Sequence, residues 1–165
     1  MFCQNILFYA FPLKARGLGL PAAATGGMLS AFAVGAAIAF LPPLSRLSDR
    51  AGRVVPIAAG LATAAAGFLT LSAVTTIPWM AAALFLYGLG FGLIFPSVSA
   101  LSADAAGEGR RGLAFGMLTA SFSAGAIAGP LVTQGLSAVA TPFTVGGLLL
   151  LLTLALGGSL ALRRR

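Results

Sequence analysis

The sequence has little charge and few side chains that carry chemistry. Of its 165 residues only 8% are charged, whereas a soluble domain has about a quarter. It has no histidine, one cysteine (Cys3) and three acids, namely Asp49, Asp104 and Glu108. The lack of histidine excludes a Ser-His-Asp triad, and a single cysteine excludes an internal disulfide. The acids and the thiol are too scattered to form a metal site. We therefore expect a protein that is not an enzyme and that needs no cofactor or metal.

Apolar residues dominate what is present. Hydrophobic side chains make up 59% of the chain and the mean hydropathy is +1.02, which excludes both a disordered chain and an ordinary soluble globule. The formal net charge is +7, but the basic residues fall in small groups between apolar runs. Such spacing is typical of the loops of a membrane protein and not of a nucleic-acid-binding patch. The sequence predicts an integral membrane protein whose surroundings are the lipid bilayer, with no nucleic-acid partner.

Three stretches without any charge define the expected spans. They cover residues 17–45, 54–103 and 112–162. A membrane-spanning helix needs about 20 apolar residues, so the first stretch holds one helix and the others hold two each. A proline-containing turn divides each long stretch, at 75–79 and at 137–142. The expected spans are about 24–44, 55–74, 79–101, 112–136 and 143–162.

A shorter apolar run precedes these spans. Residues 2–13 are apolar, and the run ends at Lys14. Twelve residues of helix cover about 18 Å, which is less than the ~30 Å of a bilayer core. We interpret the run as the second half of a helix whose beginning is missing, with a short interfacial or re-entrant segment as the alternative. The expected fold is a single all-α bundle over residues 1–165, with five full transmembrane helices and a partial one.

The basic residues predict the orientation of the bundle. The loop after the partial helix carries Lys14 and Arg16, and the next loop carries three arginines between 46 and 53. Two more lie at 110–111 and three in the tail at 163–165, while the remaining loops have none. The second and fourth loops and the tail together therefore carry eight basic residues, against two in the first loop. Cytoplasmic loops are the ones rich in lysine and arginine. We expect the 45–53 loop, the 102–112 loop and the carboxyl terminus to be cytoplasmic, in a multi-pass protein of the cell inner (plasma) membrane.

The 45–53 loop carries a spaced pattern of charge and glycine. Asp49 precedes the next helix, whose N-terminal dipole favours an anion, and Gly52 permits a sharp connection. The pattern resembles the loop signature of the major facilitator superfamily, a glycine followed four positions later by Asp-Arg-x-Gly-Arg. Four of the five key positions match, with a serine in place of the first glycine. The corresponding residues are Ser45, Asp49, Arg50, Gly52 and Arg53.

The resemblance implies that this loop acts as a gate latch between access states. In that role Asp49 would accept hydrogen bonds from a helix N-terminus or from an arginine. The candidate cytoplasmic partners within this chain are Arg110 and Arg111.

A second motif lies in the 112–136 span. Gly116, Gly125 and the pair Gly129-Pro130 resemble the family's antiporter signature, although Thr133 and Gln134 stand where the family pattern continues with two glycines. Small residues four positions apart let a neighbouring helix approach closely, and proline can bend the helix. We expect the same packing or hinge role in the 79–101 span, where the glycines are Gly88 and Gly92.

The order of these elements resembles one six-helix half of a major facilitator protein. The 79–101 span carries no arginine and the chain ends in a basic tail, which favours the carboxyl-terminal half. The resemblance implies secondary active transport of a small solute by alternating access, with efflux by antiport as one form. It also implies a partner, either a missing amino-terminal half or a second copy. In this family the first and fourth helices line the cavity, which here gives Gln4, Asn5, Tyr9 and Tyr87 as substrate-cavity candidates.

Two other classes share this composition. A scaffold or channel-like bundle would need no partner half. A transporter of another superfamily would have no reason to carry the Asp49-Arg50-x-Gly52-Arg53 pattern.

Overall fold

The computed structural model describes residues 2–41, 54–107, 109–136 and 141–163. These residues form helices and connecting turns, with no strand among them. The helices are α1 (Phe2–Gly17), α2 (Ala22–Ala39), α4 (Val54–Ala73), α5 (Ile77–Ala106), α6 (Arg111–Leu136) and α7 (Pro142–Arg163). Within the described ranges four helices, namely α2, α4, α5 and α6, are long and apolar enough to cross a membrane, and α7 contributes a shorter apolar stretch, Pro142–Gly157. The prediction of an all-α membrane bundle is confirmed.

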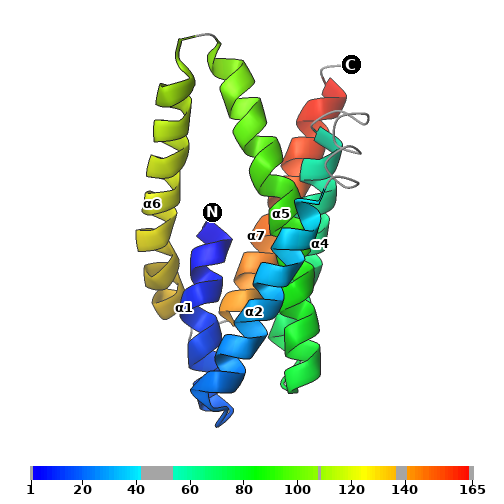
Figure 1. Ribbon diagram of the computed structural model, residues 1–165, viewed down its shortest axis with the longest axis vertical. Helices are drawn as coiled ribbons and strands as arrows, with labels where there is room; N and C mark the ends of the chain where they lie inside the picture. The colour runs from blue at the N-terminus through cyan, green and yellow to red at the C-terminus, as the bar shows by residue number, and fades with distance from the viewer. Residues whose placement is uncertain (1, 42–53, 108, 137–140, 164–165) are drawn as a thin grey trace.

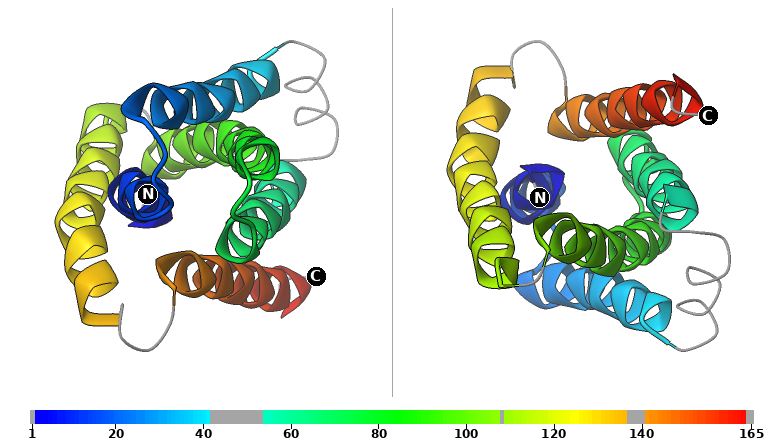
Figure 2. Two further views of the ribbon diagram at one scale, coloured as in Figure 1. Left: turned by 90° about the horizontal axis from the view of Figure 1, so that it is seen from below. Right: turned by 90° about the horizontal axis from the view of Figure 1, so that it is seen from above.

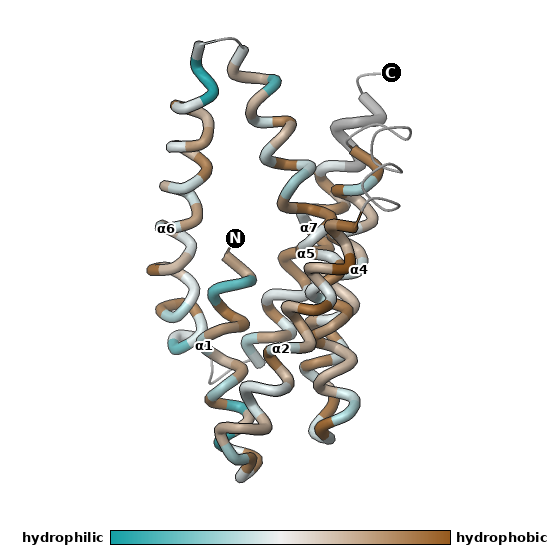
Figure 3. Tube along the Cα trace, viewed as in Figure 1, coloured by the Kyte–Doolittle hydropathy of each residue, from teal (hydrophilic) through white to brown (hydrophobic). Residues whose placement is uncertain are grey.

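Successive helices run in alternating directions along the bundle (Figure 1). One end, which we call the tail end, holds the α5–α6 connection and the end of α7. The opposite end, which we call the turn end, holds the α1–α2 connection and the α4–α5 turn. Hydrophilic residues concentrate near the ends of the helices, although α1 also has one such stretch near its beginning (Figure 3). This alternation agrees with the expected topology, and the assignment of the tail end to the cytoplasm stays a prediction.

The helices surround α1, as the end-on views show (Figure 2). Helix α5 packs against α2 and α4, α4 packs against α7, and α1 packs mainly against α6. The largest fully buried side chains come from α1, α4 and α5, so these three helices form the centre of the core. They are Ile6, Leu7, Phe11, Phe68, Leu71, Met80 and Leu84.

The contact between α2 and α5 is made backbone against backbone. A Cβ atom added at Gly88 would overlap the carbonyl oxygen of Phe32, and one at Gly35 would overlap the carbonyl oxygen of Phe85. At Gly92 the added atom would lie 2.7 Å from the carbonyl oxygen of Ala36, which is still too close for a real contact. Close approach of this kind is how helices gain packing energy in a membrane, where no hydrophobic force drives them together.

Helix α1 continues past the apolar run from which we predicted it, through Lys14 to Gly17. The Lys14 ammonium donates hydrogen bonds to the carbonyl oxygens of Leu71 and, at 2.7 Å, of Val74. It also lies 5.5 Å from the centre of the Phe143 ring. Carbonyls at the end of a helix lack partners within it, so the charge is paired with the C-terminal end of α4. Even so, 16 residues of helix span only about 24 Å, less than a full crossing.

Candidate functional site

An aromatic cluster at the middle of the bundle begins at Tyr87 of α5. Its side chain is only 4% exposed. Its ring centre lies 4.7 Å from that of Phe68 on α4 and 5.7 Å from that of Phe32 on α2. Phe91 and Phe95 follow on the same side of α5, stacked with ring centres 5.7 Å apart. The rings of Tyr87, Phe91 and Phe95 lie on the same side of α5 because positions four residues apart share one face of a helix.

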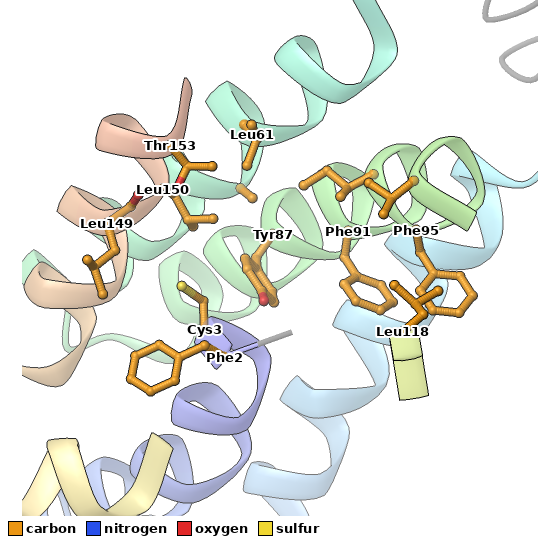
Figure 4. A pocket seen from close by; sticks show the side chains of 13 residues that line it. Phe2, Cys3, Leu61, Tyr87, Phe91, Phe95, Leu118, Leu149, Leu150 and Thr153 are labelled. Carbon is orange, nitrogen blue, oxygen red and sulfur yellow. Dashed lines mark hydrogen bonds between the residues drawn. The ribbon is translucent and has the colours of Figure 1, made fainter. Parts of the chain in front are cut away.

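A pocket of about 390 Å³ lies beside this cluster, at the beginning of α1 (Figure 4). Five helices contribute to its wall: α1, α4, α5, α6 and α7. The volume is within the usual range of small-molecule sites, about 300–1,000 Å³. Side chains on its wall include Phe2, Cys3, Leu61, Tyr87, Phe91, Phe95, Leu118, Leu149, Leu150 and Thr153.

The chemistry of this pocket is mostly apolar and aromatic. Two of its three polar side chains already donate to helix backbone: Cys3 Sγ to the Gly146 carbonyl oxygen at 3.6 Å, and Thr153 Oγ1 to that of Leu149 at 2.8 Å. The Tyr87 ring lies on the pocket wall between Cys3 and Phe91 (Figure 4). The arrangement can hold an apolar, planar molecule by stacking and burial, with the Tyr87 hydroxyl as the polar group for recognition.

The four predicted cavity residues do not gather in one place. Tyr87 lines the pocket, whereas Asn5 and Tyr9 lie at the contact between α1 and α6. There the Gln134 amide donates a 2.8 Å hydrogen bond to the Tyr9 hydroxyl. Gln4 is only 9% exposed, and within the described residues its Oε1 atom has no hydrogen-bond partner. A buried acceptor without a partner costs about 1–3 kcal/mol, which makes Gln4 the least satisfied side chain of α1.

Of the residues that line the pocket, only Tyr87 was predicted, and those that we did not predict include Phe91, Phe95, Leu118 and Thr153. Phe91 and Phe95 follow Tyr87 at four-residue intervals, so their spacing was a signal that they share its face. Nothing in the sequence marks Leu118 and Thr153, because they reach the pocket from α6 and α7 through the tertiary fold.

The predicted packing glycines lie in different surroundings. Gly88 and Gly92 face α2, as described above, and a Cβ atom at Gly129 would lie 3.3 Å from Asn5 Cβ on α1. Gly125 is buried in α6 and Pro130 lies inside the same helix. Gly116 makes no close contact, since no atom lies within 4 Å of a Cβ atom built there.

The predicted gating loop, with Ser45, Asp49, Arg50, Gly52 and Arg53, lies outside the described residues. Its candidate partners Arg110 and Arg111 are exposed where α6 begins, at the tail end. The α5–α6 connection uses two left-handed glycines, Gly107 at φ 72° and Gly109 at φ 87°. Helix α2 ends and α4 begins at the same end, so the two arginines lie on the side of the bundle where that loop connects.

Within the described parts of the chain, no group of three or more His, Cys, Asp or Glu side chains is placed to hold a metal ion. The candidate site is the pocket beside Tyr87, which is lined by five helices of the bundle. A comparison with known protein families gives a match to the Major Facilitator Superfamily over residues 1–165. The chain belongs to the major facilitator superfamily. A comparison with curated proteins found no match.

Membership explains the contacts between helices. Each half of a major facilitator protein contains two inverted repeats of three helices. If α1, α2 and α4 form the first repeat and α5, α6 and α7 the second, the contacts α1–α6, α2–α5 and α4–α7 each join one repeat to the other. The chain is therefore a multi-pass membrane protein of a transporter family, with an internal arrangement that suits one six-helix half.

Proposed function

We propose that this chain is the carboxyl-terminal half of a major facilitator transporter and that it carries a small apolar solute by alternating access. The observation that supports it most is the five-helix pocket, whose wall combines Tyr87, Phe91 and Phe95 with helices from both repeats. A wall of this chemistry favours an aromatic solute over a sugar or an ion. The uncharged α5 up to Ala103 agrees with the assignment to the carboxyl-terminal half.

The proposal requires a partner on the open side of α6. In the half nearer the tail end, most side chains of α6 are exposed, including those of Leu113, Phe115 and Met117. The glycines Gly112 and Gly116 in the same stretch have open space around them. An amino-terminal half packed there would use the small residues for close contact, and a second copy of this chain is the alternative partner.

Efflux is the direction that we propose, with the antiporter-like glycines of α6 as its support. Nile red, an uncharged aromatic dye that enters cells, is a suitable probe. Cells that express the chain in its native full-length context should accumulate less dye than cells with an empty vector.

Phe95→Ala should restore accumulation, because it removes a ring from the pocket wall. Phe40→Ala is the matched control, since Phe40 is an exposed ring at the end of α2 outside the pocket. Equal accumulation with and without the protein would contradict efflux of an aromatic solute.

A further inference from the structure

A second pocket lies at the turn end of the bundle. Its volume is about 370 Å³, and α1, α4, α6 and α7 all contribute to it, together with residues of the adjoining turns. Its inner wall is formed by buried residues such as Phe143 and Thr133, which are 3% and 6% exposed. Its rim is formed by exposed residues, among them Leu13, Thr75 and Thr141. The pocket is therefore an apolar recess that opens at the end of the helices.

One cation faces this recess. Lys14 lines the pocket, and its ammonium donates to the carbonyl oxygens of Leu71 and Val74. An ammonium group has three N–H donors, so these two bonds leave one donor for a ligand. Pairing with the end of α4 explains why the charge is stable at this position. It does not explain why a recess large enough for a ligand lies beside it.

The charged residues of α1, which lie at this end of the protein, are positive. Lys14 and Arg16 both belong to the last turn of α1. The sequence has three acids, at positions 49, 104 and 108, and Asp104 lies near the opposite end of the bundle, in the last turn of α5. No acid therefore neutralises the cations on the described helices that form the recess, and the recess is complementary to an anion.

The level of the recess relative to a membrane is marked by Trp79. This side chain is 64% exposed and lies in the first turn of α5, four residues after Thr75 on the pocket rim. Exposed tryptophan side chains in membrane proteins concentrate at the level of the lipid headgroups. A molecule in the recess would thus have its polar part beside phosphate groups and its apolar part beside acyl chains.

We infer that the recess at the turn end binds an anionic phospholipid of the adjacent leaflet, with its phosphate on Lys14 and an acyl chain against Leu13 and Phe143. The inference goes beyond transport and does not depend on it, because it concerns a different pocket at the other end of the helices. The bound lipid would bridge α1, α4, α6 and α7 at the point where Lys14 already joins three of them.

The test compares lipid retention in mixed nanodiscs of phosphatidylcholine and phosphatidylglycerol, measured by native mass spectrometry of the released protein. Wild-type protein should retain phosphatidylglycerol in preference to phosphatidylcholine. One cation near an anionic headgroup changes binding about fivefold, so Lys14→Gln should reduce the preference by about that factor. Arg16→Gln removes the same charge at the same end but outside the pocket lining, and it should leave the preference nearly unchanged.

A second pair of variants keeps the Lys14 hydrogen bonds intact. Thr75→Trp places a large ring on the pocket rim, and it should lower phosphatidylglycerol retention. This variant tests the pocket independently if Lys14→Gln destabilises the fold. Thr76→Trp is its control, because Thr76 is exposed, adjacent and outside the pocket lining, and its side chain makes no capping hydrogen bond. Retention by Lys14→Gln and Thr75→Trp equal to that of their controls would overturn the inference.

A free amphipathic anion has the same combination of negative charge and apolar chain as an anionic phospholipid, so the test must distinguish the two. Decanoate added to nanodiscs of phosphatidylcholine alone tests it. If decanoate raises the melting temperature of wild-type protein but not of Lys14→Gln, and phosphatidylglycerol shows no preference, the occupant is a free solute and the phospholipid assignment is wrong. If decanoate has no such effect while phosphatidylglycerol is retained, the assignment stands.

Discussion

Gly35→Ala should prevent the normal packing of α2 on α5 and cause a large loss of stability. The added methyl group would overlap the Phe85 carbonyl oxygen and lie 3.1 Å from the Leu89 amide nitrogen. Backbone atoms cannot rotate away as a side chain can, so the two helices must separate. Overpacking of a close contact costs about 1–3 kcal/mol, and here the loss should lie at the upper end. The measurement is the melting temperature in detergent.

Gly27→Ala is the matched control, because it is the same substitution in the same helix. No atom lies within 4 Å of a Cβ atom at Gly27. Alanine is also the better helix former, by up to about 1 kcal/mol, so this variant should melt at the same temperature as wild type or slightly above it. If the two variants melted together, the close α2–α5 contact would not exist in the folded protein.

The second large effect should come from Asp49→Asn, which we expect to reduce transport strongly with little effect on folding. By resemblance to the family's loop pattern, we propose that Asp49 acts as a latch between access states. An exposed ion pair contributes only about 0–1 kcal/mol to stability. A difference of about 1.4 kcal/mol between two access states nevertheless changes their ratio tenfold. The measurements are Nile red efflux and melting temperature on the same variant, with Asp104→Asn as the control acid outside the motif.

The two outcomes separate a gating role from a capping role. If Asp49 only capped the helix that follows, the melting temperature should fall while transport per folded molecule stayed normal. Normal efflux by Asp49→Asn would contradict the gating role altogether.

Local patterns were sufficient to predict the helices but not their neighbours. The uncharged stretches locate α2, α4, α5 and α6 because a bilayer requires long apolar helices, whatever packs against them. The glycines of α5 could be identified as packing positions from their four-residue spacing. Their partner Gly35 could not, because which helices meet is determined by the whole bundle.

Long-range contacts also explain why the site was only partly predicted. Tyr87 could be chosen as a polar ring in an apolar span, but Asn5 and Tyr9, which follow the same logic, are directed at α6. Lys14 appeared to end a helix because a charge interrupts an apolar run. Its partners, the carbonyl oxygens of Leu71 and Val74, lie 57 and 60 residues away in the sequence, and no local pattern could reveal them.

Transport by alternating access requires the pocket beside Tyr87 to open to each side of the membrane in turn. The most direct measurement is the reaction of a single cysteine at Leu118, on the pocket wall, with a membrane-impermeant maleimide in a Cys3→Ser background. Cysteines at the exposed positions Thr76 and Ala105 serve as markers of the outer and the cytoplasmic side. Right-side-out vesicles should label position 76 and inside-out vesicles should label position 105, whereas position 118 should react in both. Asp49→Asn should shift the reaction of position 118 toward one side. Reaction of position 118 from one side only, unchanged by Asp49→Asn, would contradict alternating access.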